Sequence, residues 1–516
     1  MQQEITISVS PKAATEELSI KFSAAKHLNI DAKDISSVVV QKRSIDARSR
    51  KINVHLKVTV YSDGENAINP NYEREYKNIS SATPIIIVGS GPAGLFAALR
   101  LIELGLKPII IERGKDVIQR RKDLAKIHKH EVNPDSNYCY GEGGAGTYSD
   151  GKLYTRSKKR GSVQRILEIL VGHGAVEDIM IDTHPHIGTN KLPKIIAKMR
   201  ENILAAGGEL HFNCRVEDFV IKGNKIEGVV DQNGNKILGH SVILATGHSA
   251  RDVFYLLNKH KILLEAKSFA MGVRIEHPQP IIDAEQYRCE IRSRYLPAAS
   301  YKLVHQVNGK GVFSFCMCPG GQIVPSATTP GEVVVNGMSA STRSSRYANS
   351  GMVVAIEPED LKAYAKHGDL AGLVFQQEME KMAWVAGGKT QAAPAQRMVD
   401  FTNNKFSNNL NDCSYIPGIN SAPLHELLPP VIGHRLQVGF KAFGRKMKGF
   451  YTNQANILGV ESRTSSPIRI PRDSESLHHP QIVNLYPCGE GAGYAGGIVS
   501  AAIDGERCAE AIKSTI

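Results

Sequence analysis

The stretch PIIIVGSGPAGLFAALRLIELGLKPIIIERG, residues 84–114, decides the fold of this chain. Residues 85–88 form a short apolar run, which is typical of a buried parallel strand, and apolar residues recur at helical spacing over residues 95–102. The turn between them carries glycines in G-x-G-x-x-G spacing, at Gly89, Gly91 and Gly94. A second apolar run, residues 108–111, leads to Glu112. This order of elements predicts a β-α-β unit.

Such a unit is typical of dinucleotide binding. Its glycines let the backbone turn tightly beside a pyrophosphate, and the free N–H groups at the helix start attract that anion. Pro92 and Ala93 open the predicted helix, and Glu112, followed by Arg113, stands where an acid accepts hydrogen bonds from a ribose. We therefore expect a dinucleotide site here; the alternative is a glycine turn with a structural role alone.

The composition bounds the size and location of the protein. Its 516 residues, 42% of them apolar, can bury a large core and are too many for one ordinary domain. We expect a cytoplasmic protein, because the sequence has neither a signal-peptide pattern nor an apolar run that could span a bilayer. The eight cysteines contain no C-x-x-C pair, which favours reduced, mostly buried thiols over disulfides or a metal site.

Residues 1–80 are expected to form a small basic α/β module. The chain has 63 Lys and Arg against 51 Asp and Glu, a formal charge of +12, and residues 41–51 of the module are rich in these cations. We expect that stretch to connect two strands, at 35–40 and 52–61. Contact with RNA is one interpretation; a solvated basic surface is the favoured one, since no aromatic stacking platform accompanies the charges.

A second glycine-rich segment, residues 139–152, follows the β-α-β unit. Its glycines predict backbone held close to something flat or bulky, such as a flavin ring, while the alternative is a surface loop. Asp150 and Lys152 end this segment and are our candidates for contact with substrate or flavin, although solvated surface charges are an equal alternative. The residues of the segment that we assign to a cofactor site are Gly143, Gly144 and Gly146.

The rest of the chain divides into an insertion and a return to the first fold. Residues 241–247 predict a buried strand that ends in Ala245, Thr246 and Gly247, which suits close backbone approach at a sheet edge. Residues 262–450 have strand-like runs and two helical patches, and predict an inserted α+β substrate or cap domain. No second G-x-G-x-x-G follows a strand there, which argues against a dedicated NAD(P)H domain but leaves NAD(P)H open as a transient donor.

Residues 482–505 again read as strand, glycine loop and helix, so the sequence has the three-part signature of a two-dinucleotide-fold flavoprotein. The chain resembles the uncharacterised FAD-dependent dehydrogenase-like proteins, whose pattern GEGGAGTxSDGKL matches residues 141–153, and is more distantly similar to the BaiN-like and tRNA-modifying GidA-like flavoproteins. The resemblance implies a Rossmann-like FAD-binding domain of the glutathione-reductase type. FAD domain segments are then expected at 84–261 and 451–516, around the inserted domain.

The resemblance also implies roles for individual residues. The first three glycines would line the pyrophosphate, the backbone of Val216 would meet the adenine, and Glu490 would bind the ribityl or pyrophosphate region. A helix that starts near Gly497 would point its N-terminus at the pyrimidine edge of the flavin, where reduction places negative charge; an ordinary buried helix start is the alternative. The residues assigned to FAD in this last motif are Gly489, Glu490, Gly496, Gly497 and Ile498.

Catalytic residues are harder to select from the sequence. His184, His186 and His248 stand near predicted strand ends and are candidate proton carriers, with structural histidines the favoured alternative. Arginines of the inserted segment are candidates for binding a substrate anion, at Arg343, Arg346 and Arg463. Cys316 and Cys318 form the nearest approach to a redox pair, although two small core side chains are the favoured interpretation.

The leading functional hypothesis is an FAD-dependent oxidoreductase, a dehydrogenase or reductase that moves hydride or electrons between FAD and an unknown small organic substrate. A second is a tRNA-modifying or RNA-binding flavoprotein, and a third is a flavin-binding regulatory protein without turnover. No metal site and no membrane contact are expected. The sequence leaves the substrate and the oligomeric state open.

Overall fold

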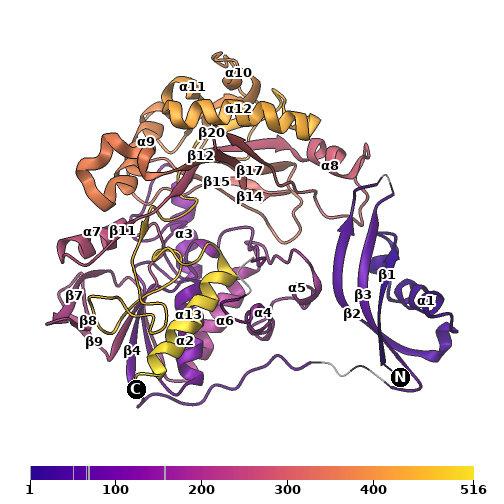
Figure 1. Ribbon diagram of the computed structural model, residues 1–516, viewed down its shortest axis with the longest axis horizontal. Helices are drawn as coiled ribbons and strands as arrows, with labels where there is room; N and C mark the ends of the chain where they lie inside the picture. Colours follow the sequence, from indigo (N-terminus) through magenta and orange to yellow (C-terminus); the bar gives the residue numbers. More distant parts are fainter. Residues whose placement is uncertain (1, 50, 66, 68–69, 156–158) are drawn as a thin grey trace.

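The computed structural model describes residues 2–49, 51–65, 67, 70–155 and 159–516. Figure 1 shows two layered units, one above the other, with a small module beside them that carries the N-terminus. Helices and strands alternate along the chain, and the predicted mixed α/β fold is confirmed. Within the described residues, no helix is both long and apolar enough to cross a bilayer.

The lower unit in Figure 1 is built on a five-stranded, wholly parallel sheet. In spatial order its strands are β22 (Leu485–Pro487), β10 (Ser241–Leu244), β4 (Pro84–Val88), β5 (Lys107–Ile111) and β6 (Glu209–His211). The chain runs from β4 outward through β5 to β6 and later returns to β10, which lies on the opposite side of β4. The direction in which strands are added therefore reverses at β4. Open α/β sheets bind ligands at such a switch point, outside the carboxyl ends of the strands.

Helices cover this sheet because their apolar faces pack on strands that are buried on both sides. Helix α13 lies beside α2 (Figure 1), although the two are far apart in the sequence. A three-stranded antiparallel meander, β7 (Val216–Lys222), β8 (Lys225–Asp231) and β9 (Lys236–Leu238), adjoins the sheet. The helices of this unit are α2 (Pro92–Glu103), α3 (Val117–Ile127), α4 (Val163–Gly172), α5 (Asp178–Ile181), α6 (Leu192–Ala205), α7 (Arg251–Lys259) and α13 (Ile498–Lys513), with the short 3-10 turn η3 (Gly144–Gly146).

The upper unit contains a seven-stranded mixed sheet. Its strands in spatial order are β13 (Val304–Val307), β14 (Lys310–Cys318), β17 (Tyr347–Ile356), β12 (Phe269–Pro278), β20 (Asn456–Glu461), β18 (Ala393–Arg397) and β19 (Ile419–Ser421). Strand β20 lies beyond the domain boundary expected at residue 450, so the sheet extends past that boundary. The sequence analysis missed this because a run of six buried residues reads equally well as a strand of either sheet.

Helices and two small ribbons complete the upper unit, with α12 lying over the sheet in Figure 1. The helices are α8 (Gln279–Tyr287), α9 (Ala371–Ala386), α10 (Met398–Thr402), α11 (Leu424–Leu427), α12 (Pro430–Lys446), η4 (Pro358–Leu370) and η5 (Lys448–Phe450). The ribbons pair β11 (Glu265–Ala266) with β21 (Ile468–Arg469), and β15 (Gln322–Pro325) with β16 (Val335–Met338). A large apolar core lies between the sheet and its helices.

The N-terminal module has its own core and a three-stranded sheet with β3 in the centre. Its elements are β1 (Gln2–Val9), η1 (Ala13–Thr15), α1 (Glu17–Leu28), η2 (Ala32–Asp34), β2 (Ile35–Asp46) and β3 (Asn53–Ser62). Strand β2 is longer than expected, so residues 41–46 of the basic stretch lie in a strand and only the remainder connects β2 to β3. Arg50 of that stretch, and residues 66, 68 and 69 of the segment that leads to β4, lie outside the described residues.

The basic stretch is partly neutralised within the protein. Arg43 forms ion pairs with Asp178 at 3.0 Å and with Asp182 at 2.7 Å, which attach the module to α5 and the segment after it. Arg48 pairs with Asp46 on the module itself at 2.6 Å. These arginines therefore have protein partners, which fits a structural role at least as well as contact with nucleic acid.

Candidate functional site

The three predicted glycine motifs meet at the carboxyl edge of the five-stranded sheet. Gly89 follows β4 with a φ of 106°. A side chain there would come within 2.5 Å of the carbonyl oxygen of Ala245, which follows β10. A Cβ at Gly491, which follows β22, would likewise lie 2.5 Å from the carbonyl oxygen of Gly247. Segments up to 400 residues apart thus form one edge, because their turns lack side chains that would separate them.

Two helices begin at this edge, at different distances from the sheet. Helix α2 has Gly91 as its N-cap and starts directly after β4. Helix α13 has Gly497 as its N-cap, and its middle residue Gly505 packs against the backbone of Ala93 in the first turn of α2. The N-terminus of α13 therefore projects farther out from the sheet than that of α2. Each helix start offers backbone N–H groups without partners in the helix and a partial positive charge.

The second glycine segment packs against the first. The N–H of Gly143 donates to the carbonyl oxygen of Ser90 at 2.9 Å. A Cβ at Gly144 would lie 3.2 Å from the Cα of Gly91, and one at Gly146 would lie 3.2 Å from the Ile498 side chain. The sequence analysis attributed these glycines to contact with a ligand, whereas the protein itself already requires them to be small.

Glu112 joins the two glycine segments. Its carboxylate accepts hydrogen bonds from the Ser90 N–H at 3.0 Å, the Ser90 hydroxyl at 2.7 Å, the Gly114 N–H at 2.9 Å and the Gly141 N–H at 3.0 Å. A carboxylate has about four acceptor positions, and all are in use. A ribose hydroxyl would have to displace one of these donors, so the role of Glu112 toward a ribose stays a prediction.

Arg113 and Val216 lie next to this carboxylate but are themselves engaged. Arg113 pairs with Asp135 at 2.8 Å and with Asp252 at 3.0 Å, and its guanidinium lies 4.2 Å from the centre of the Tyr140 ring. Val216 is buried at the start of β7. The structure therefore places both residues beside the first motif, and their predicted contact with an adenosine stays untested.

Several groups at the edge lack a partner among the residues that the structure describes, which allows a test of fit for a dinucleotide. A Cβ at Gly247, Gly496 or Gly497 would have no atom within 4 Å. Nε2 of His248 is buried without a hydrogen-bond partner. Backbone faces open to a flat group, helix starts open to an anion and a polar atom without a partner suit the pyrophosphate and flavin of FAD. The residues present fit this cofactor.

Glu490 lies beside His248 at this edge. Its carboxylate is 3.6 Å from Nδ1 of His248 and remains 29% exposed. Lys267 is near it and was missed by the sequence analysis, because an isolated lysine between two strands carries no pattern. Burial, and then Arg469, lower the pKa of Lys267, while Glu490 raises it. The edge thus holds an acid, an imidazole and a lysine that the sequence does not bring together.

Asp150 and Lys152 lie together on the side that faces the upper unit. The Asp150 carboxylate is buried and accepts hydrogen bonds from Nε of Arg343 at 3.1 Å and from Nη2 at 2.5 Å. Lys152 Nζ is 3.7 Å from Asp150 and donates to the carbonyl oxygen of Met317. Burial alone would lower the pKa of Lys152, but Cys318, Cys316 and Asp150 raise it overall. Neither residue is a free surface charge.

The other candidates from the sequence are mostly committed elsewhere. Arg463 is buried and pairs with Glu380 at 2.8 Å and with Glu332 at 3.4 Å, so its predicted role in binding a substrate anion is wrong. Arg343 serves Asp150, and Arg346 is an exposed residue near Asp412. His186 contacts the Ser341 carbonyl oxygen, with a pKa lowered first by burial and then by Arg343, and His184 packs edge-on against Tyr154.

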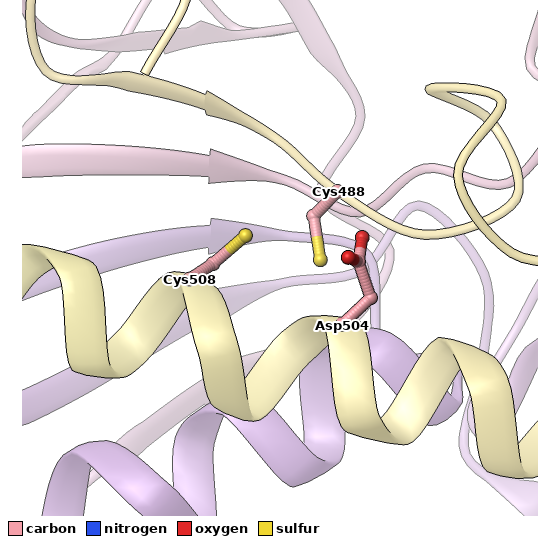
Figure 2. A group of neighbouring side chains, drawn as sticks. All are labelled: Cys488, Asp504 and Cys508. Carbon is pink, nitrogen blue, oxygen red and sulfur yellow. The ribbon is translucent and has the colours of Figure 1, made fainter. Parts of the chain in front are cut away.

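One further cluster has the composition of a metal site. Figure 2 shows Cys488, Asp504 and Cys508 together, with Asp504 and Cys508 both on α13. The Asp504 carboxylate already accepts hydrogen bonds from Arg472 at 2.6 and 3.0 Å and from the Gly489 N–H at 2.8 Å. Because a buried arginine neutralises this acid, the cluster is better described as an internal ion pair beside two thiols than as a metal centre.

Three protein families match parts of the chain. A family described as a domain of unknown function matches residues 1–61, the FAD binding domain matches residues 82–126, and a family described as FAD-dependent protein, C-terminal domain-like, matches residues 268–464. The second match covers β4, α2 and β5 with the first glycine motif. The third covers all seven strands of the seven-stranded sheet.

Comparison with individual proteins adds a relative that spans nearly the whole chain. An uncharacterized protein of Clostridium beijerinckii is 41% identical over 507 residues, which cover 94% of this chain and 94% of that protein. A thiamine thiazole synthase of Methanococcus vannielii is 26% identical over 190 residues, 35% of this chain and 61% of the synthase. The structure of CtdE in complex with FAD has a TM-score of 0.33 at 12% identity over 84% of each chain, a likeness that carries no functional argument.

Proposed function

We propose, from the premise that this chain belongs to the same family as the uncharacterized protein of Clostridium beijerinckii and carries domains of FAD-dependent families, that it is an oxidoreductase. FAD is its cofactor. The reaction we propose is transfer of hydride or electrons between FAD and a small organic substrate. The observation that carries this proposal is the convergence of three glycine motifs on one sheet edge that leaves Gly247, Gly496 and Gly497 open.

The two helix starts would divide the cofactor between them. Helix α2 begins directly at the sheet and would bind the pyrophosphate through its first N–H groups. Helix α13 projects farther out and would place its positive end beside the flavin, where it would stabilise the negative charge of the reduced ring. Bound FAD supplies the centre that takes up and releases an electron pair.

The chain itself would then orient the substrate and exclude water. Asp150 and Lys152 end the segment that packs on the first glycine motif, so they would lie between the cofactor and the upper unit. The ion pair from Arg343 to Asp150 fixes both carboxylate oxygens and, through them, the position of Lys152. Lys152 would hold a negative group of the substrate at Nζ. The finer likeness to BaiN-like and GidA-like proteins, and the glutathione-reductase type, stay predictions.

Anaerobic reduction of the purified protein tests this proposal. We expect a yellow protein whose flavin absorbance is lost on addition of NADH, NADPH or another donor of a panel, and returns with an oxidised acceptor. A protein that stays colourless after incubation with FAD would contradict both the cofactor and the reaction. A flavin that is reduced by dithionite but by none of the donors would support binding without turnover.

A variant can separate loss of FAD from loss of the fold. Gly497 has a φ of 165°, which any residue adopts, and nothing lies within 4 Å of a Cβ there. Gly497→Leu should therefore fold normally and lose FAD, because its side chain would fill the space of the ring. Ser514→Leu adds the same side chain at the exposed far end of α13 and should keep FAD. Equal FAD content in the two variants would contradict the proposed site.

A further inference from the structure

Cys316 and Cys318 lie at a β-bulge of β14, where its regular pairing with β17 is interrupted. Phe315 pairs with Gly351 and Cys318 with Asn349, so β14 accommodates one more residue than β17 between these pairs. Cys316 has a φ of 46°, in the left-handed region. A residue other than glycine is uncommon there, and such strain gathers at functional sites. The bulge re-aims the side chains that follow Phe315.

The bulge brings the two thiols together. Sγ of Cys318 donates to the carbonyl oxygen of Cys316 at 3.3 Å, and the two thiols are close enough for each to shift the pKa of the other. Cys318 is buried, whereas Cys316 is only half-buried. One residue of the pair is thus partly exposed and the other is buried, which suits an attacking and a resolving cysteine.

Two cations flank the pair. Nη2 of Arg274 donates to the Cys316 carbonyl oxygen at 2.8 Å and to Sγ of Cys318 at 3.6 Å. Lys152 Nζ contacts the carbonyl oxygen of Met317, between the two cysteines. We call Lys152, Arg274, Cys316 and Cys318 the thiol pocket. A pocket of this charge favours a thiolate over a thiol, and the thiolate is the reactive form.

The pKa values of the two thiols shift in opposite directions. The interaction with Cys318 lowers the pKa of Cys316, burial raises it, Lys152 and Arg274 lower it further, and Asp150 opposes them, so that the balance is a lowered pKa. The pKa of Cys318 is raised, first by its interaction with Cys316 and then by burial. Two adjacent thiols with opposite shifts are poised for stepwise oxidation, because the thiolate of one is ready to react while the other keeps its proton.

The thiol pocket is connected to the cofactor edge by a short segment. Lys152 ends the second glycine segment, whose Gly143 N–H donates to Ser90 and whose Gly144 packs on Gly91. Residues 143–152 thus reach from the start of α2 to the pair. This path places the thiols on the side of the upper unit that faces the proposed flavin edge.

We propose that Cys316 and Cys318 form a redox-active dithiol that exchanges an electron pair with FAD, an inference that rests on the proposed oxidoreductase function. In the oxidising direction the Cys316 thiolate and the Cys318 thiol together give up two electrons and the one remaining S–H proton, and one Sγ–Sγ bond forms. Bound FAD would supply the acceptor for this electron pair and proton. In the reverse direction the Sγ–Sγ bond breaks, and Cys316 leaves as the thiolate while Cys318 takes up the proton. This assigns Lys152 to stabilising the Cys316 thiolate.

Electron counting tests the proposal. After reoxidation by air, the holoprotein should take up about four electrons per FAD from dithionite under anaerobic conditions, because flavin and disulfide are each two-electron couples. Cys316→Ser and Cys318→Ser should each take up about two. Cys289→Ser removes another half-buried thiol and should keep the value of about four. Uptake of about two electrons by the wild-type protein would overturn the dithiol.

Peptide mass spectrometry gives a second readout that does not need the flavin. Oxidised protein, digested after alkylation, should yield the peptide with both cysteines as an internal disulfide, and the dithionite-reduced protein should yield it doubly alkylated. Double alkylation in both states would contradict the proposal while leaving FAD reduction by donors intact. A protein that fails to bind FAD but still forms the disulfide would contradict the proposed function and the transfer to FAD, not the reactivity of the pair.

Discussion

Two pairs of cysteines in this chain each lie beside a buried ion pair of an arginine and a carboxylate, but the residues around the two pairs differ. Cys316 and Cys318 lie beside the buried ion pair of Arg274 with Glu461, and Cys488 and Cys508 lie beside that of Arg472 with Asp504. In each pair one arginine N–H donates to one sulfur, Cys318 or Cys508, at 3.6 Å. Sequence spacing does not reveal this likeness, since one residue separates the first two cysteines and nineteen separate the second two.

The difference is one lysine and access to solvent. Lys152 adds a second cation to the first pair, and Cys316 is half-buried. The second pair is wholly buried, and the pKa of Cys488 is raised by its hydrogen bond with Cys508, by burial and by Asp504. The same residue types thus give a reactive thiol where Lys152 and partial exposure are added to the arginine–carboxylate pair, and an inert thiol where both are absent.

The largest expected effect is on stability, at the second pair. Arg472→Met leaves the Asp504 carboxylate buried without its partner, which should cost about 3–5 kcal/mol in the free energy of unfolding, measured by denaturant titration. Arg346→Met is the control, because the Arg346 side chain is exposed, with contacts to Asp412 and the Tyr347 ring, and its loss should cost less than about 1 kcal/mol. Similar losses for both variants would show that Arg472 and Asp504 do not hold α13 in place.

The acid of the first pair should make stability depend on pH. Burial raises the pKa of Glu461 to about 7 from 4.5, against the opposing effect of Arg274. The folded state therefore holds a proton that the unfolded state releases, a contribution present below pH 4.5 and lost as pH rises to 7. Relative to Glu461→Gln, the wild-type protein should lose about 2–3 kcal/mol of stability across this window.

Denaturant titrations of both proteins between these pH values check this. Glu359→Gln, which changes an exposed acid, sets the baseline. The free energy of unfolding of the wild type relative to Glu461→Gln could instead stay constant, or rise, as pH rises. Either result would mean that Arg274 holds Glu461 ionised throughout. The thiol pocket would then have its arginine fully neutralised, and Lys152 alone would supply its positive charge.

Alkylation rates compare the two pairs directly. At pH 7, with the protein reduced, iodoacetamide should modify Cys316 at least about 100-fold faster than Cys488, because thiolate fraction and access both favour Cys316. Quantitative peptide mass spectrometry over time measures the two rates in one sample. Unfolded protein serves as the control and should show nearly equal rates. Equal rates in the folded protein would remove the electrostatic distinction between the pairs.

The sequence predicted the parts of the fold that depend on local pattern. The strands and glycine turns of residues 84–114, 241–247 and 482–505 could be recognised because each motif combines an apolar run with backbone positions that only small residues can fill. The assignment of β20 failed, because its partners β12 and β18 are distant in the chain. Local pattern specifies a strand, and only long-range packing specifies its sheet.

The candidate site shows the same division. Asp150 and Lys152 were selected from their place beside the glycines, whereas Arg274 and Glu461 carry no signal because an arginine in an apolar strand is ambiguous. Cys316 and Cys318 were interpreted as core residues on the assumption of a regular strand. The bulge at Cys316, which breaks that regularity, is not encoded by a glycine or any other turn residue. The bulge contacts Lys152, which is more than 160 residues away in the chain, through the carbonyl oxygen of Met317.

The smallest expected effect isolates the residue that distinguishes the pairs. Lys152→Met keeps the length of the side chain and removes its charge, which should raise the pKa of Cys316 by about one unit from its lowered value of about 5. Alkylation should therefore slow about tenfold near pH 4, below both pKa values, and change little at pH 7, where the thiolate predominates in both proteins. The pH profile of the alkylation rate measures this shift, and Lys152→Arg should restore the wild-type profile because it restores the cation. The rate at Cys488 is the internal control and should not change. If Lys152→Met slowed alkylation equally at every pH, Lys152 would act by positioning the strand rather than by its charge, and the first pair would differ from the second in access alone.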